Sequence, residues 1–223
     1  MTPGCGVAVL LLAQLVDESN PEPDSRRLSA ALPRLVNKND FSTFKDHIQR
    51  GANVDHLASS GRPLLMHAVL APDRNHFVQY LIQQGANLEI VDPKGYTPMH
   101  AAAFSGNHGA ARMLIEGGAE FDTPHTDGFS PMMRAVARRS LETLKVLLEA
   151  GADPDMLHYH KKTGNWITAY DFAPDNMRPI LTEYSELKAT GASISMEQSK
   201  KSEGSSDDQG ECDVDEDDGE CAA

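Results

Sequence analysis

Nine histidines are the residues of this 223-residue chain most suited to acid–base chemistry or metal binding. His125, His158 and His160 fall near the tips of successive loops of the expected fold, where two imidazoles could approach each other. A zinc site needs three or four such ligands, and the sequence places no cysteine or carboxylate beside them to complete the set. We therefore expect no metal site and no cofactor.

The C-terminal residues contain an approximate calcium-binding pattern, because Asp213, Asp215 and Asp217 match the first three ligand positions of an EF-hand loop. The sixth position is Asp218 where such a loop needs glycine, and the chain ends before the twelfth. Nearby, Ser205 and Ser206 precede two aspartates, a context that suits an acid-directed kinase. None of these residues predicts a specific ion site.

A catalytic centre is not indicated anywhere else in the chain. No serine or cysteine nucleophile has a recognisable base partner, and no glycine-rich phosphate loop follows a strand-like segment. The three cysteines lie outside the regular part of the sequence and form no C-x-x-C pair, at Cys5, Cys212 and Cys221. The sequence predicts a protein that is not an enzyme.

The elements that must position any functional residue are repeated units. A Gly-Ala pair closes each unit, and successive pairs are separated by 85−51=34, 118−85=33 and 151−118=33 residues. A second glycine marker opens each unit at intervals of 95−61=34 and 128−95=33. Self-similarity with this period predicts a stack of short supersecondary units.

The most regular unit begins with residues 95–103, which read GYTPMHAAA. Thr97 is placed to cap a helix, Pro98 suits the first helical position, and Gly106 can adopt the positive φ of a turn between two helices. This segment matches the T-P-L-H-x-A pattern, and the chain resembles the ankyrin repeat family. The resemblance implies an all-α solenoid of about five units including two caps, and it implies that His100 bonds to Thr97.

The other units depart from this pattern at defined places. The second unit carries one extra residue within 71–75, which we expect to lengthen a surface turn without disturbing its helices. The fourth has Arg139 where the third has Gly106, so either the turn relaxes or Arg139 is strained by about 1 kcal/mol. The fifth has a surplus of five residues (168−130=38 against 33) in 156–166, and residues 168–173 resemble an ankyrin C-terminal cap.

We divide the chain into an apolar N-terminal segment with a linker (1–27), a repeat domain (28–188) and a disordered acidic tail (189–223). The final helix is expected at 180–188. The apolar run 7–16 is too short to span a membrane. It lacks a basic n-region, so a cytoplasmic or nuclear location is preferred over secretion through a signal peptide at 1–16.

Charge limits the class of partner. The net charge is −13, of which residues 197–223 contribute −9 and residues 1–196 contribute −4. Nucleic acid binding requires a clustered basic face, and no such cluster is readable. We expect a protein partner, no nucleic acid, and a monomer.

The resemblance implies that function lies on the loop tips and on the inner helices. Aromatic and arginine side chains make hot spots in such surfaces, and the predicted partner-binding residues are Arg62, Tyr96, Phe104, Phe129, Tyr159, His160 and Trp166. The competing interpretation is that Tyr96 and Phe129 pack on the next loop and that Trp166 covers the cap. The function predicted is a non-enzymatic binding module or adaptor; the alternative is a regulatory or inhibitory subunit whose acidic tail contributes.

Overall fold

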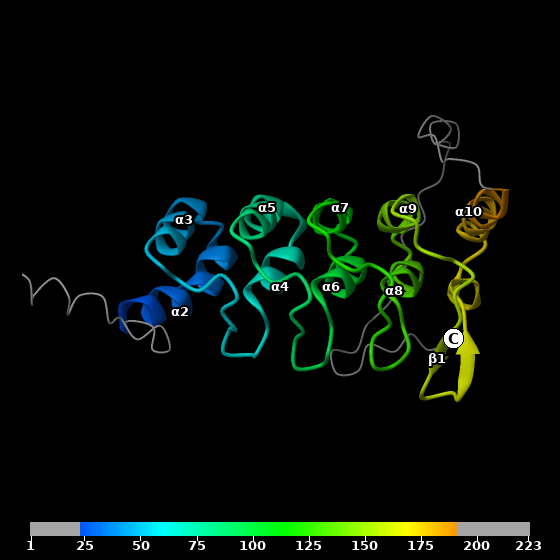
Figure 1. The fold of residues 1–223 in the computed structure, drawn as a ribbon, viewed down its shortest axis with the longest axis horizontal. Coiled ribbons are helices and arrows are strands. Elements are labelled where there is room, and N and C mark those ends of the chain that lie inside the picture. Colours follow the sequence, from blue (N-terminus) through cyan, green and yellow to red (C-terminus); the bar gives the residue numbers. More distant parts are fainter. Residues whose placement is uncertain (1–22, 191–223) are drawn as a thin grey trace, which may run out of the picture.

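The structure, a computed structural model, describes residues 23–190. These residues form pairs of antiparallel helices joined by long loops, and they end in a short hairpin and a final helix (Figure 1). In chain order the elements are α2 (Pro23–Lys38), α3 (Phe41–Gln49), α4 (Leu64–Val69), η2 (Pro72–Arg74), α5 (Asn75–Gln83), α6 (Pro98–Ser105), α7 (His108–Glu116), α8 (Pro131–Ala137), α9 (Leu141–Glu149), β1 (His158–His160), β2 (Asn165–Ile167), η3 (Ala169–Phe172) and α10 (Arg178–Thr190).

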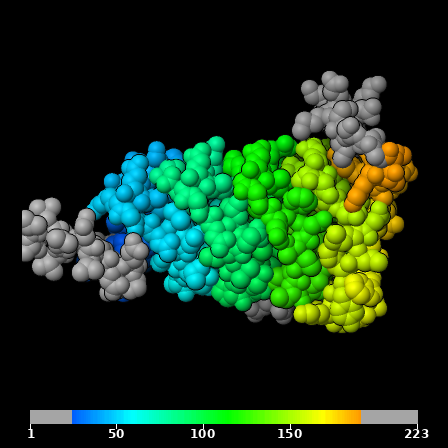
Figure 2. All heavy atoms as spheres, in the orientation of Figure 1, coloured from blue at the N-terminus to red at the C-terminus, as the bar shows by residue number. Residues whose placement is uncertain are grey.

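The helices form two rows. The inner helices α4, α6 and α8 contact one another in sequence, and so do the outer helices α5, α7 and α9. The loops that join one pair to the next project from the inner row, and we call them fingers 51–62, 85–96, 118–129 and 151–167 (Figure 1). Figure 2 shows the units following each other as bands along the long axis. The predicted all-helical solenoid is confirmed, apart from the hairpin described below.

Local sequence explains the most regular helix pair. Thr97 accepts a hydrogen bond from the His100 amide, Pro98 occupies the first turn of α6, and Gly106 ends the helix with φ of 69°. Ala102 and Ala103 are fully buried, because small side chains let the neighbouring helices approach closely. The capping roles predicted for this unit are therefore confirmed.

Both ends of the domain differ from the sequence prediction. Helix α2 begins at Pro23, so the predicted linker is wrong from residue 23 onward; proline is favoured at the first helical position, where its missing N–H costs nothing. Helix α10 begins at Arg178, before the predicted start at 180, because Pro179 lies in its first turn, where proline is tolerated. It ends at Thr190, so residues 189 and 190 are helical and the tail predicted from 189 is wrong at these two residues.

The extra residue of the second unit is absorbed outside the helices. Residues Pro72–Arg74 form the single 3-10 turn η2 before α5 begins. Phe77, Val78 and Leu81 are fully buried, so the register of α5 is kept as predicted. The surplus in finger 151–167 has a different result. It forms the antiparallel hairpin β1–β2, in which Tyr159 pairs with Trp166, and Gly164 adopts φ of 70° near its turn.

A recurring hydrogen bond links each finger to the next. The amide of Asn87 donates to Asp55 Oδ1 at 2.8 Å, the amide of Glu120 to Glu89 Oε1 at 2.9 Å, and the amide of Asp153 to Asp122 Oδ2 at 3.4 Å. The acceptors are 89−55=34 and 122−89=33 residues apart, so they occupy the same position in successive units. Each finger is therefore bonded to the next at the same position.

Several predictions concern residues outside the described range. They are the signal peptide at 1–16, the acidic tail from 191 onward, the calcium-like aspartates, the tail serines and the three cysteines. None of the helices described between residues 23 and 190 combines the length and the apolar character that a membrane-spanning helix needs.

Candidate protein-binding surface

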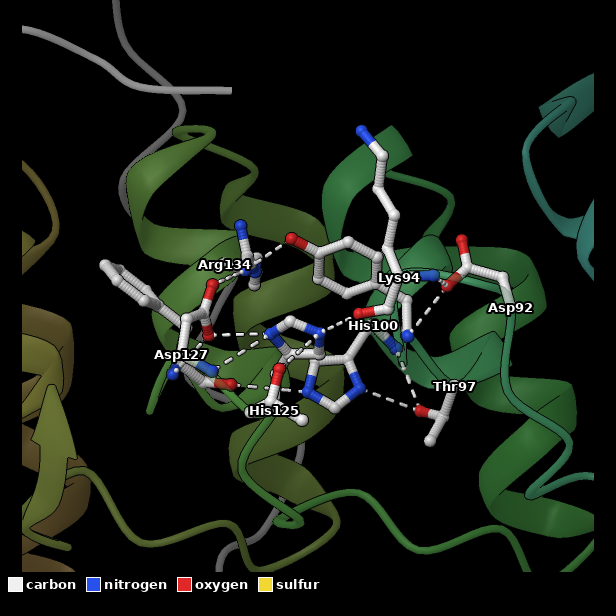
Figure 3. A network of polar contacts seen from close by, with 10 residues as sticks. Asp92, Lys94, Thr97, His100, His125, Asp127 and Arg134 are labelled. Atoms are coloured by element: carbon white, nitrogen blue, oxygen red, sulfur yellow. Dashed lines mark hydrogen bonds and ion pairs between the residues drawn. The ribbon is translucent and has the colours of Figure 1, made fainter. Parts of the chain in front are cut away.

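Tyr96 lies on finger 85–96, and its ring is held by residues of the next unit. The imidazole of His125 stacks on it, with ring centroids 4.0 Å apart and planes inclined by 14°. The guanidinium of Arg134 on α8 lies 4.7 Å from the ring centroid and donates to the Tyr96 hydroxyl at 2.9 Å. The ring is half-buried as a result. Figure 3 shows the surrounding network.

His125 joins the two fingers through both ring nitrogens. Its Nε2–H donates to the Lys94 carbonyl at 2.7 Å, and its Nδ1 lies 2.8 Å from Asp127 Oδ1 (Figure 3). The other oxygen of Asp127 forms an ion pair with Arg134. Burial alone would raise the pKa of Asp127, but the Phe129 amide, His125 and Arg134 outweigh it, and the net shift is downward.

His100 lies beneath this network and has a structural role. Its Nδ1 is 2.8 Å from Thr97 Oγ1 and its Nε2 is 3.3 Å from the Phe129 carbonyl, so the bond to Thr97 that the family resemblance implied is present. Burial lowers the pKa of His100 to about 4, since the charged imidazolium is poorly solvated there and His125 and Arg134 are close.

Phe129 occupies the same position in the next unit, and it is also half-buried. The centroid of its ring lies 4.9 Å from that of Phe172 and 5.2 Å from that of His160, and the Arg134 guanidinium lies 5.0 Å from the Phe129 centroid. Tyr96 and Phe129 therefore pack between units, as the competing interpretation of the sequence proposed. Contact of either ring with a partner stays a prediction.

Arg62 occupies the position of Tyr96 and Phe129 in the second unit, directly after an opening glycine. It is half-buried beside His67. The pKa of His67 is lowered, first by burial and then by the positive charge of Arg62. His160 is half-buried as well, and its Nδ1 lies 2.8 Å from Thr163 Oγ1 within the hairpin turn.

The remaining predicted residues are exposed. Trp166 is 65% exposed and Tyr159 48% exposed, and their rings lie 5.5 Å apart across the β1–β2 pair. Trp166 therefore does not cover the C-terminal cap. Phe104, at the end of α6, is 43% exposed beneath the Arg138 guanidinium, which lies 4.6 Å from its centroid.

A shallow concavity of about 330 Å³ lies between finger 118–129 and the hairpin. The apolar side chains of Pro124, Leu157 and Trp166 line it together with Tyr159 and Lys161. Its wide opening suits a side chain of a bound protein more than an enclosed small molecule.

Exposed aliphatic residues at equivalent positions of the fingers were missed by sequence reasoning. Leu57, Val91 and Leu157 are each about half exposed. Leu57 and Val91 both stand four residues before an opening glycine (61−57=4 and 95−91=4), and this regularity is readable from the sequence. They extend the apolar surface along the row of fingers.

Within residues 23–190, no three His, Cys, Asp or Glu side chains are grouped so that they could hold a metal ion. His125 is instead engaged by Tyr96, Lys94 and Asp127.

A family model described as ankyrin repeats (3 copies) matches residues 32–125 and 65–157, which together cover more than half of the chain. No curated protein matches the sequence.

Proposed function

Because this chain belongs to the ankyrin repeat family, whose repeats are generally protein–protein interaction modules, we propose that it is a non-enzymatic adaptor that binds a protein partner through its finger tips and inner-helix face.

One observation carries this proposal: the large exposed apolar side chains of residues 23–190 all lie on the fingers or at the end of an inner helix. They are Leu57, Val91, Phe104, Met156, Leu157, Tyr159 and Trp166. The described outer helices α3, α5, α7 and α9 contribute none. Single exposed apolar residues are ordinary, whereas their segregation to one side of an elongated molecule is typical of an interaction surface.

The exposed aromatic residues Tyr159 and Trp166 lie on a hairpin that is packed against the neighbouring finger. The backbone of Tyr159 lies against Gly128. A Cβ added at Gly128 would be 2.2 Å from the carbonyl oxygen of Tyr159. The Lys161 amide also donates to the Asp127 carbonyl, and His160 packs edge-on against Phe129. The hairpin is therefore anchored to the neighbouring finger, and Trp166 and Tyr159 would lose little conformational entropy on binding.

Site-specific photo-cross-linking tests the proposal. A benzophenone amino acid is placed at Trp166 or at Phe104 of the full chain in cells that express it, and the same group is placed at Gln79 on the outer helix α5 as the control. We expect protein adducts from Trp166 and Phe104 but not from Gln79, which is exposed on the opposite row.

The adducts must also depend on the apolar surface. A variant with Leu157→Ser and Tyr159→Ser should lose the adduct formed at Trp166, whereas Gln79→Ser should keep it. Equal adducts from both faces, or none from the finger side, would contradict a finger-side binding surface.

A further inference from the structure

Arg139 adopts a backbone conformation that favours glycine. Its φ is 55°, at the turn where the preceding unit has Gly106 with φ of 69°. The equivalent turn of the first unit has Asn39 with φ of 58°, and asparagine tolerates this conformation better than other non-glycine residues. Of the two outcomes left open by the sequence, the strained one is present. Backbone strain of this kind persists at functional sites more often than elsewhere.

The Arg139 side chain gains nothing within the fold that would explain this strain. It is exposed, and among residues 23–190 its guanidinium makes no hydrogen bond, ion pair or ring contact. Glu142, the next carboxylate along the chain, is bound to Lys145 at 3.2 Å. The stability of the domain therefore does not account for arginine at this turn.

The neighbouring Arg138 is also exposed and has no carboxylate partner in the described part of the chain. Its Nε donates to the Phe104 carbonyl at 3.2 Å, and its guanidinium lies on the Phe104 ring. These contacts fix the guanidinium in place. The turns carrying Gly106 and Ser140 touch, since a Cβ on Gly106 would lie 3.1 Å from Ser140 Oγ. Phe104 and the two arginines thus lie at the same end of α6 and α8.

We infer that Phe104, Arg138 and Arg139 form a docking site for an acidic segment of the partner protein, a conclusion that builds on the proposed binding function. Two uncompensated guanidinium groups on a chain of net charge −13 make a local positive region. Arginine binds carboxylates through paired N–H donors, and the exposed Phe104 ring offers apolar contact to an adjacent side chain. The segment recognised is therefore rich in aspartate or glutamate and carries an apolar residue.

Fluorescence polarisation with defined peptides tests this assignment on the full chain. The probe is a short fluorescein-labelled peptide of glutamate, leucine and serine, and the reference peptide has glutamine in place of every glutamate. We expect the glutamate peptide to bind about tenfold more tightly than the glutamine peptide, with an affinity that falls as salt is added. Equal binding of the two peptides, or no binding of either, overturns the inference.

Substitution of Arg139 separates binding from stability. Arg139→Gly should weaken binding of the glutamate peptide about threefold, and combined with Arg138→Gln about tenfold. The same Arg139→Gly change should raise the melting temperature by about 1–4 °C, because glycine adopts positive φ without strain. The matched control Arg50→Gln removes an exposed arginine already paired with Asp46 and should leave peptide affinity unchanged.

Three further results would overturn the inference. Unchanged affinity in Arg139→Gly, or a fall in its melting temperature, overturns the inference even if the finger-side adducts at Trp166 are obtained. Tighter peptide binding after the combined changes Asp213→Asn, Asp215→Asn and Asp217→Asn would show that acidic residues of this chain occupy the site. That result would also overturn the inference that the site binds a separate partner.

Discussion

The imidazole of His125 lies flat on the phenol ring of Tyr96, and this stack joins two successive fingers. Arg134 contacts the same phenol from α8 and pairs with Asp127 on the finger that carries His125. The aromatic ring of one unit is thus contacted by charged and aromatic groups of the next, so hydrogen-bonded and cation–π contacts join the third and fourth units in addition to apolar packing.

The Tyr96 hydroxyl should contribute measurably to this coupling. Tyr96→Phe removes the 2.9 Å bond from Arg134 and leaves the stack on His125 in place. We expect the free energy of unfolding in urea to fall by about 1 kcal/mol. Tyr96→Ala removes the stack and the cation–π contact as well and should cost about 2–4 kcal/mol. Equal effects of the two substitutions would show that the ring contacts contribute nothing.

Stability should fall in mild acid because His100 is buried in its neutral form. Its pKa is about 4 in the fold and 6.5 in its usual range, so between these values the unfolded chain binds a proton that the folded chain does not. The stabilising contribution is complete above pH 6.5 and is lost as pH falls toward 4, by about 3 kcal/mol in total. Urea unfolding across this pH range measures how steeply the free energy of unfolding changes with pH.

The control for this slope comes from the next unit, which has Met133 at the position of His100. His100→Met should flatten the pH dependence relative to the parent chain. Burial also lowers the pKa of His56, His67 and His158, and their contribution is common to both proteins. A slope unchanged by His100→Met would contradict the role assigned to this residue.

Two glycines with similar backbone angles should respond differently to alanine. Gly128 and Gly151 have φ of 96° and 99°, but a Cβ at Gly128 would meet the Tyr159 carbonyl whereas the space around Gly151 is open. We expect Gly151→Ala to cost about 1 kcal/mol from strain alone, and Gly128→Ala to cost about 2–4 kcal/mol because the hairpin must also move. Urea denaturation of both variants measures the difference; equal costs would mean that the hairpin is not anchored at Gly128.

Trp166 should matter little to folding despite its size. The side chain is 65% exposed, and its described ring contact is the cross-strand one with Tyr159. Trp166→Ala should therefore lower the free energy of unfolding by less than about 1 kcal/mol. Trp166 is the only tryptophan, so acrylamide quenching of its fluorescence reports directly on its exposure. Weak quenching, or a large loss of stability on substitution, would place it in the core.

The repeat architecture could be predicted because its signals are local. Glycines with positive φ recur with the period of the repeat. Thr97 caps α6 and Pro98 occupies its first position, so the start of this helix depends only on neighbouring residues. The register of α5 was predictable too, since Phe77 and its apolar neighbours keep helical spacing after the insertion.

The candidate surface could be predicted only in part, because exposure depends on distant residues. The burial of Tyr96 is decided by His125 and Arg134, which lie 29 and 38 residues further on. The five extra residues of finger 151–167 could be counted from the sequence, but the pairing of β1 with β2 could not be predicted from it. The conformation of Arg139 followed from the pattern only as one of two alternatives.

The recurring amide–carboxylate bonds give successive fingers one common way of joining. Every internal joint uses the same donor position and the same acceptor position, at Asp55, Glu89 and Asp122. A duplicated copy of residues 86–118, spliced in after Gly118, would find a matching acceptor before it and a matching donor after it. Gene duplication could lengthen this molecule while keeping the bond between fingers, although the Tyr96 ring before the insertion would lose its contacts with His125 and Arg134.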